Sequence, residues 1–201
     1  MMNRIWMAVS AASVLLACGG GSSPGGGGSA TVTGTAGGAS LSNVAEAISF
    51  VYAGPSCKDS STQNNGFTIY LSSSTGICAS AQNNSTPPSG TVLAIIVNNV
   101  GSAAQPAIVP GTYNVQLVSN PETSGIFGTL TNGCNTSGNG GYAGSGTVTL
   151  TSVTSGGVVG SYNFNMVDRS LNANGSLSGN FTTTNCPLTA AQYCAPSTTK
   201  C

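Results

Sequence analysis

Short runs of apolar and β-branched residues, separated by turn-forming residues, fill the chain from about residue 39 onward. In most of these runs apolar and polar side chains alternate, which is typical of a β-strand with one buried face. Between residues 91 and 97 nearly every side chain is apolar, so we expect that strand to be covered on both faces. The predicted strands are 44–53, 67–71, 91–97, 112–118, 126–131, 147–153, 161–167 and 177–183.

This series of strands predicts an all-β fold, either an antiparallel β-sandwich or a small β-barrel of about eight strands. Helix is expected only as a turn near Val44 and another turn around 188–193. The Asn-Gly pairs at 65–66, 132–133 and 174–175 indicate tight turns next to strands, because these residues tolerate positive φ angles.

Two segments echo one another. Residues 111–118 read Gly-Thr-Tyr-Asn-Val-Gln-Leu-Val, and residues 160–167 read Gly-Ser-Tyr-Asn-Phe-Asn-Met-Val. The similarity indicates either a duplicated hairpin or two strands that obey the same alternation, and the sequence leaves both interpretations open.

The N-terminus has a different pattern. Arg4 precedes an uncharged run over residues 5–16, and the run ends in Leu15-Leu16-Ala17-Cys18 followed by Gly19. A helix that crosses a bilayer needs about 20 apolar residues, so this run is too short to span one. Its length is that of the hydrophobic region of a secretory signal peptide.

The segment Leu15-Leu16-Ala17-Cys18 resembles the lipobox of bacterial lipoprotein precursors, although Leu16 is bulkier than the usual residue there. The resemblance implies that residues 1–17 are a cleaved signal peptide and that the Cys18 sulfur carries a diacylglyceryl group. It also implies acylation of the new α-amine, for example by palmitate. Gly19, in place of Asp, implies sorting to the cell outer membrane, on its periplasmic or its surface face. The alternative is an ordinary signal peptide with Cys18 as a normal cysteine.

Half of the residues from 19 to 38 are glycine, and most of the others are Ser, Thr and Ala. This composition is typical of a flexible linker. We therefore expect a signal peptide over 1–17, a lipidated cysteine with its tether over 18–38, and a single all-β domain over 39–201.

The chain has seven cysteines, and six remain when Cys18 is assigned to lipid. An even number of cysteines in an exported chain predicts disulfides. The spacing of the cysteines does not determine which of them pair. A zinc site is the weaker alternative, because there is no His and no C-x₂-C pair. Our guess at the pairing joins Cys57 to Cys78, Cys134 to Cys186, and Cys194 to Cys201.

The chain contains four basic and four acidic residues and no His. The sequence has no basic patch of the kind that would indicate a nucleic-acid partner. Because there is no His, catalytic triads that depend on histidine are excluded. Glu46, Asp59, Glu122 and Asp168 fall at strand ends or in loops, where we expect solvated charges. Two of them together would suit glycoside hydrolysis. Asp59 or Asp168 with backbone carbonyls would suit calcium.

Tyr142 lies in a glycine-rich stretch, 138–146, that we expect to form a loop. There it would either contact a ligand or fold back over the core. Few charges are available to protect strand edges from pairing with another chain.

The sequence therefore predicts a membrane-anchored, non-catalytic structural or binding module of the cell envelope. No cofactor or metal is expected, and the ligand, whether a glycan or another surface, is not identified. The alternatives are a carboxylate-dependent hydrolase resembling glycosidases and a self-associating surface protein.

Overall fold

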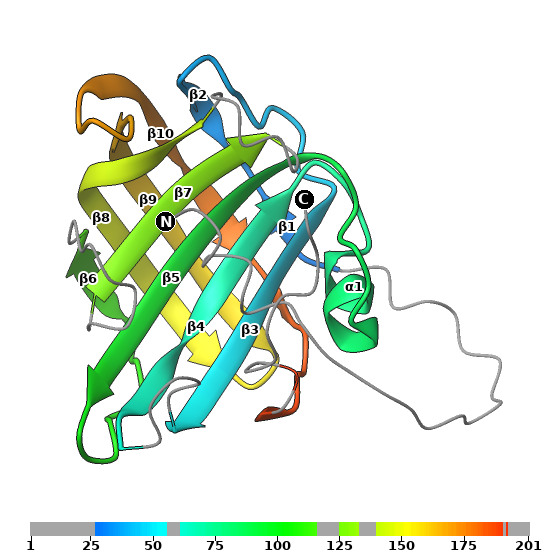
Figure 1. The fold of residues 1–201 in the computed structure, drawn as a ribbon, viewed down its shortest axis with the longest axis vertical. Helices are drawn as coiled ribbons and strands as arrows, with labels where there is room; N and C mark the ends of the chain where they lie inside the picture. The colour runs from blue at the N-terminus through cyan, green and yellow to red at the C-terminus, as the bar shows by residue number, and fades with distance from the viewer. Residues whose placement is uncertain (1–26, 56–60, 116–124, 133–139, 191, 193–201) are drawn as a thin grey trace, which may run out of the picture.

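A computed structural model describes residues 27–55, 61–115, 125–132, 140–190 and 192. The described residues form eleven strands and one short helix, α1 (Figure 1). In chain order the elements are β1 (Ser29–Ala30), β2 (Thr33–Ala36), β3 (Glu46–Pro55), β4 (Gln63–Ser72), α1 (Ile77–Asn83), β5 (Thr91–Gly101), β6 (Gly111–Asn114), β7 (Gly125–Asn132), β8 (Gly140–Thr154), β9 (Gly157–Val167), β10 (Ala173–Thr182) and β11 (Thr184–Asn185).

One hydrogen-bonded path runs β1-β10-β9-β8-β7-β5-β4-β3-β11, with β2 also beside β10 and β6 also beside β8. Among the described strands, every pairing is antiparallel except that of β11 with β3. The path folds over so that β3, β4, β5 and β7 form one layer and β8, β9 and β10 form the other (Figure 1). The parallel link through β11 is two residues long, so the architecture is sandwich-like and not a regular closed barrel. The all-β prediction is confirmed.

The main core fills the space between the two layers. Phe67, Ile69 and Leu71 of β4 point into it, as their alternation predicts, and so do Tyr162 and Phe164 of β9. The rings of these last two residues lie 5.1 Å apart. Burial of this apolar surface is the main favourable contribution to folding.

The first layer is buried on its outer face as well. Phe50 of β3 and Tyr70 of β4 lie there with ring centroids 5.3 Å apart, in an edge-to-face arrangement. Ile77 and Ala81 of α1 pack on this face, and Leu188 adds to the cover. The prediction that the strand over 91–97 is covered on both faces is confirmed, because Val92 and Ala94 belong to this second cluster while Leu93 and Ile95 belong to the main core.

The flexible-linker prediction is wrong for residues 29–36. This segment contains β1 and β2, which both pair with β10 along its edge, and the Thr31 N–H between them donates to the Asn180 carbonyl of β10. Ala36 is fully buried, and Ala30 and Val32 pack against the main core. Composition misled here because Ser, Thr and Ala side chains are small enough to fit a sheet edge wherever a strand offers hydrogen bonds.

Other predicted boundaries also differ. The helix lies at Ile77–Asn83 and not near Val44. Further along, Ala190 and Gln192 are helical, inside the second predicted turn. The strand predicted over 112–118 ends at Asn114, and residues 116–118 lie outside the described residues.

Asn65-Gly66 lies within β4 and is not a turn. A Cβ on Gly66 would come within 2.3 Å of the Val97 carbonyl oxygen, so glycine serves close approach of β5 here. Asn174-Gly175 likewise lies within β10, where the register with β9 shifts.

The two echoing segments lie on opposite sides of β8 in the same register. Tyr113 of β6 and Tyr162 of β9 both oppose Val148 of β8. Gly111 and Gly160 likewise both oppose Leu150. The repeated Gly-Ser/Thr-Tyr-Asn sequence thus presents the same residue types to both edges of one strand.

Candidate functional site

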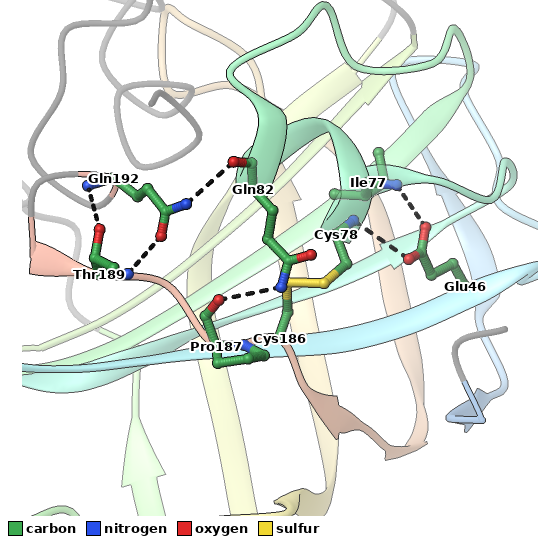
Figure 2. Close-up of a disulfide and its surroundings, with 8 residues drawn as sticks. All are labelled: Glu46, Ile77, Cys78, Gln82, Cys186, Pro187, Thr189 and Gln192. Atoms are coloured by element: carbon green, nitrogen blue, oxygen red, sulfur yellow. Dashed lines mark hydrogen bonds between the residues drawn. A yellow bond between two sulfur atoms is a disulfide. The ribbon is translucent and has the colours of Figure 1, made fainter. Parts of the chain in front are cut away.

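A disulfide joins Cys78 of α1 to Cys186, which follows β11 directly (Figure 2). The Cα atoms are 5.7 Å apart, a normal separation for a disulfide. The Cys186 N–H donates a hydrogen bond to the Ser49 carbonyl, so the bond connects the helix to a residue that is itself held against β3.

This pairing shows that two of our guesses are wrong, since Cys78 does not pair with Cys57 and Cys186 does not pair with Cys134. The guess favoured cysteines that flank one strand, but α1 carries Cys78 to a segment 108 residues further along the chain. Cys18, Cys57, Cys134, Cys194 and Cys201 lie outside the described residues.

Glu46 is buried and does not have the solvated position we expected (5 % exposed). Its carboxylate accepts hydrogen bonds from the N–H groups of Ile77 (2.7 Å) and Cys78 (3.3 Å) at the start of α1 (Figure 2). The N-cap residue, Gly76, has no side chain to do this. A carboxylate at this position accepts hydrogen bonds from N–H groups that have no partner within the helix, and its negative charge interacts favourably with the positive end of the helix dipole.

Side-chain amides connect α1 to the segment after Cys186. Gln82 Nε2 donates to the Pro187 carbonyl at 3.2 Å, and Gln192 Nε2 donates to the Gln82 carbonyl at 3.1 Å. Thr189 and Gln192 exchange side-chain and backbone hydrogen bonds, the arrangement of a capping box. Helix α1 and residues 186–192 apart from residue 191, together called the strap below, thus form one fastened unit on the outer face of β3 and β4 (Figure 2).

Tyr142 lies in β8 and not in a loop, because the strand begins at Gly140. It opposes Thr129 of β7 and Val167 of β9, and it is half-buried. Its role as a ligand contact stays a prediction.

Asp168 organises the connection between β9 and β10. Its Oδ1 accepts hydrogen bonds from the N–H groups of Ser170 (2.7 Å) and Asn172 (2.9 Å). The backbone N–H of Asn172 is the main cause that lowers the pKa of Asp168 below its ordinary value. The same turn holds Leu171 at a positive φ of 65° with its side chain exposed. Asp59 and Glu122 lie outside the described residues, and no group of three metal-ligating side chains occurs in the part of the chain that the structure describes.

The second layer has an outer face without charged side chains at its strand-paired positions. Over 145–149 of β8, 161–165 of β9 and 176–180 of β10, inward positions alternate with hydroxyl and amide side chains that point outward. The strand pairings align these outward side chains in three rows, here called the polar face. The rows are Thr112, Thr149, Ser161 and Asn180; then Asn114, Thr147, Asn163, Ser178 and Thr33; then Ser145, Asn165, Ser176 and Thr35.

Neighbouring members of the rows bond to each other. The hydroxyl oxygens of Thr112 and Thr149 are 3.0 Å apart, and Asn165 Nδ2 donates to Ser145 Oγ at 3.0 Å. The alternation in the sequence predicts that these side chains point outward. Their alignment across five strands depends on the register of the strand pairs.

No helix within the described ranges is long and apolar enough to cross a membrane. No protein-family model, curated protein or solved structure matches this chain.

Proposed function

We propose that this chain is an outer-membrane lipoprotein whose β-domain is a non-catalytic binding or structural module, anchored by acyl chains on Cys18. The observation that carries the proposal is the Cys78–Cys186 disulfide. Disulfides persist in oxidising compartments outside the cytosol, and the lipobox-like segment ending at Cys18 predicts export independently.

The described carboxylates support a non-catalytic role. Glu46 accepts from two helix N–H groups, and Asp168 accepts from two N–H groups of its own turn. A carboxylate that acted as a hydrolytic acid or nucleophile would have to release these hydrogen bonds. The alternative is a hydrolase that uses Asp59 and Glu122. Glycoside hydrolysis by the wild type that is lost in Asp59→Asn or in Glu122→Gln would favour this alternative.

Intact-mass measurement of the protein extracted from membranes tests the proposal. We expect a chain that begins at Cys18 and carries diacylglyceryl and acyl groups, and a gain of two hydrogen masses per disulfide on reduction. The Cys18→Ser variant should lack the lipid and leave the membrane fraction. A wild-type chain with an unmodified Cys18 would refute the anchoring.

A further inference from the structure

We infer that the polar face is a binding surface for a neutral polysaccharide. The inference names the ligand class of the binding module proposed above, but it does not depend on the lipid on Cys18. Three observations carry it: the chemistry of the rows, their alignment, and their construction from a repeated sequence.

The chemistry of the rows excludes most other partners. They contain only Ser, Thr and Asn, so no cation is available for phosphates or acidic chains. The three rows themselves contain none of the aromatic, Met and Arg side chains that protein interfaces concentrate, and no apolar patch for a lipid surface. Tyr142 and Val167, both half-buried, pair with each other on the same outward side beyond the third row. What remains is a surface that donates and accepts hydrogen bonds without charge, which matches the hydroxyl groups of an uncharged sugar chain.

The alignment makes several contacts available to one ligand. Adjacent strands lie about 4.8 Å apart and alternate residues along a strand about 6.7 Å apart, so the rows form a two-dimensional array of hydroxyl and amide groups. Asn163, Asn165, Ser176 and Ser178 at its centre are all exposed. An extended polymer that repeats its hydroxyl groups engages many such positions together, and weak single contacts then add to a useful affinity.

The repeated segments build the array on both sides of β8. Thr112 and Ser161 both oppose Thr149, and the two asparagines that follow the tyrosines both oppose Thr147. In each repeat the tyrosine packs toward the core, whereas the Ser or Thr before it and the Asn after it point outward. The same short sequence therefore supplies the fold on one face and the same hydrogen-bonding groups on the other.

Retention of the detergent-extracted mature protein on cellulose, chitin and cross-linked dextran tests the inference. We expect retention on at least one of these neutral polysaccharides, insensitive to salt because no charge takes part. Retention on none of them would overturn the inference, and so would binding that moderate salt abolishes.

The decisive variant is Thr149→Val/Asn163→Ala/Ser178→Ala, which removes polar groups from two rows. One hydrogen bond changes affinity about fivefold, so the three changes should weaken binding about a hundredfold. The control, Thr86→Val/Asn83→Ala/Ser102→Ala, removes the same groups from exposed positions off the face and should bind as the wild type does. Thermal unfolding of both variants checks that the fold is retained.

Equal binding by the face variant and the control would overturn the inference. Reversible self-association in sedimentation that only the face variant abolishes would overturn it in favour of a second copy of the chain. The Cys18→Ser variant should keep its polysaccharide binding, so failure of the lipid anchor and failure of the binding surface are distinguishable.

Discussion

Loss of the Cys78–Cys186 disulfide should destabilise the domain strongly, and the variant Cys78→Ala/Cys186→Ala tests this. The bond spans 108 residues. In the chain-entropy description a loop of this length contributes about 4.8 kcal/mol at 25 °C, because the cross-link restricts the unfolded chain. A further disulfide within the loop would shorten the effective loop and reduce this value. Since domains are stable by about 5–15 kcal/mol, the predicted loss is a large fraction of the total.

Denaturant unfolding followed by circular dichroism measures this loss. We expect a shift of the midpoint to lower denaturant and a fall in the melting temperature of about 10–20 °C, at 2–4 °C per kcal/mol for a chain of this size. Each single variant, Cys78→Ala or Cys186→Ala, should cost about as much as the double variant, because either change removes the same bond.

Two results would refute this reasoning. A double variant that loses less than about 1 kcal/mol would show that the strap is held without the disulfide. Single variants whose effects add up to that of the double variant would show that the two sulfurs act through separate contacts.

Single polar groups of the domain make separate contributions to stability that can be measured. Glu46→Ala leaves the N–H groups of Ile77 and Cys78 without their acceptor and should cost about 1–3 kcal/mol, with faster exchange of those amide hydrogens, whereas Glu46→Gln keeps an acceptor and should cost less. The folded-state pKa of Asp168 is lowered, so its stabilisation should be fully present above its ordinary value of 3.8 and disappear as pH falls through the lower folded-state pKa; the difference in unfolding midpoint between wild type and Asp168→Ala should follow that course, and a difference constant down to pH 2 would contradict it. Burial raises the pKa of Tyr162 above its ordinary value of 10.0, so stability should be complete below pH 10 and fall as pH rises further, and Tyr162→Phe should show a weaker alkaline decline in unfolding midpoint.

Alternation predicted the central strands well because it is a local signal. Ile48 and Phe50 of β3, and Tyr162 and Phe164 of β9, are buried on the faces that the pattern assigns to them. A period of two residues fixes which side chains share a face, whatever the rest of the chain does. The all-β class and the double-sided burial of β5 follow from the same signal.

The glycine-rich segments were mispredicted because their structure depends on a partner strand. Gly146 has φ +130°, and a Cβ there would meet the Asn163 carbonyl oxygen at 2.0 Å, so β8 needs glycine to lie this close to β9. Composition alone cannot separate such a strand from a loop. The error over 140–146 and the error over 29–36 have this common origin.

Helix α1 was not predicted because the contacts that fasten it to the rest of the domain are distant in sequence. Helix α1 is seven residues long, too short to be stable by itself. Glu46 accepts from the N–H of Ile77, Cys186 bonds to the Cys78 sulfur, and the Pro187 carbonyl accepts from the Gln82 amide. Each of these partners is at least 31 residues away in the sequence. Part of the polar face was visible as alternating Thr, Asn and Ser, but the alignment of its rows depends on register.

The start of the sheet at Ser29 limits where the polar face lies if Cys18 is anchored. Ten residues separate Cys18 from Ser29, half of what composition assigned to the tether, and a fully extended chain of that length spans about 35 Å. Ser29 begins the segment that pairs with β10, and Thr33 and Thr35 of that segment belong to the rows of the polar face. The point where the tether enters the sheet and the proposed binding surface therefore share one sheet edge, so an anchor on Cys18 would hold a polysaccharide bound there within about one domain's width of the membrane.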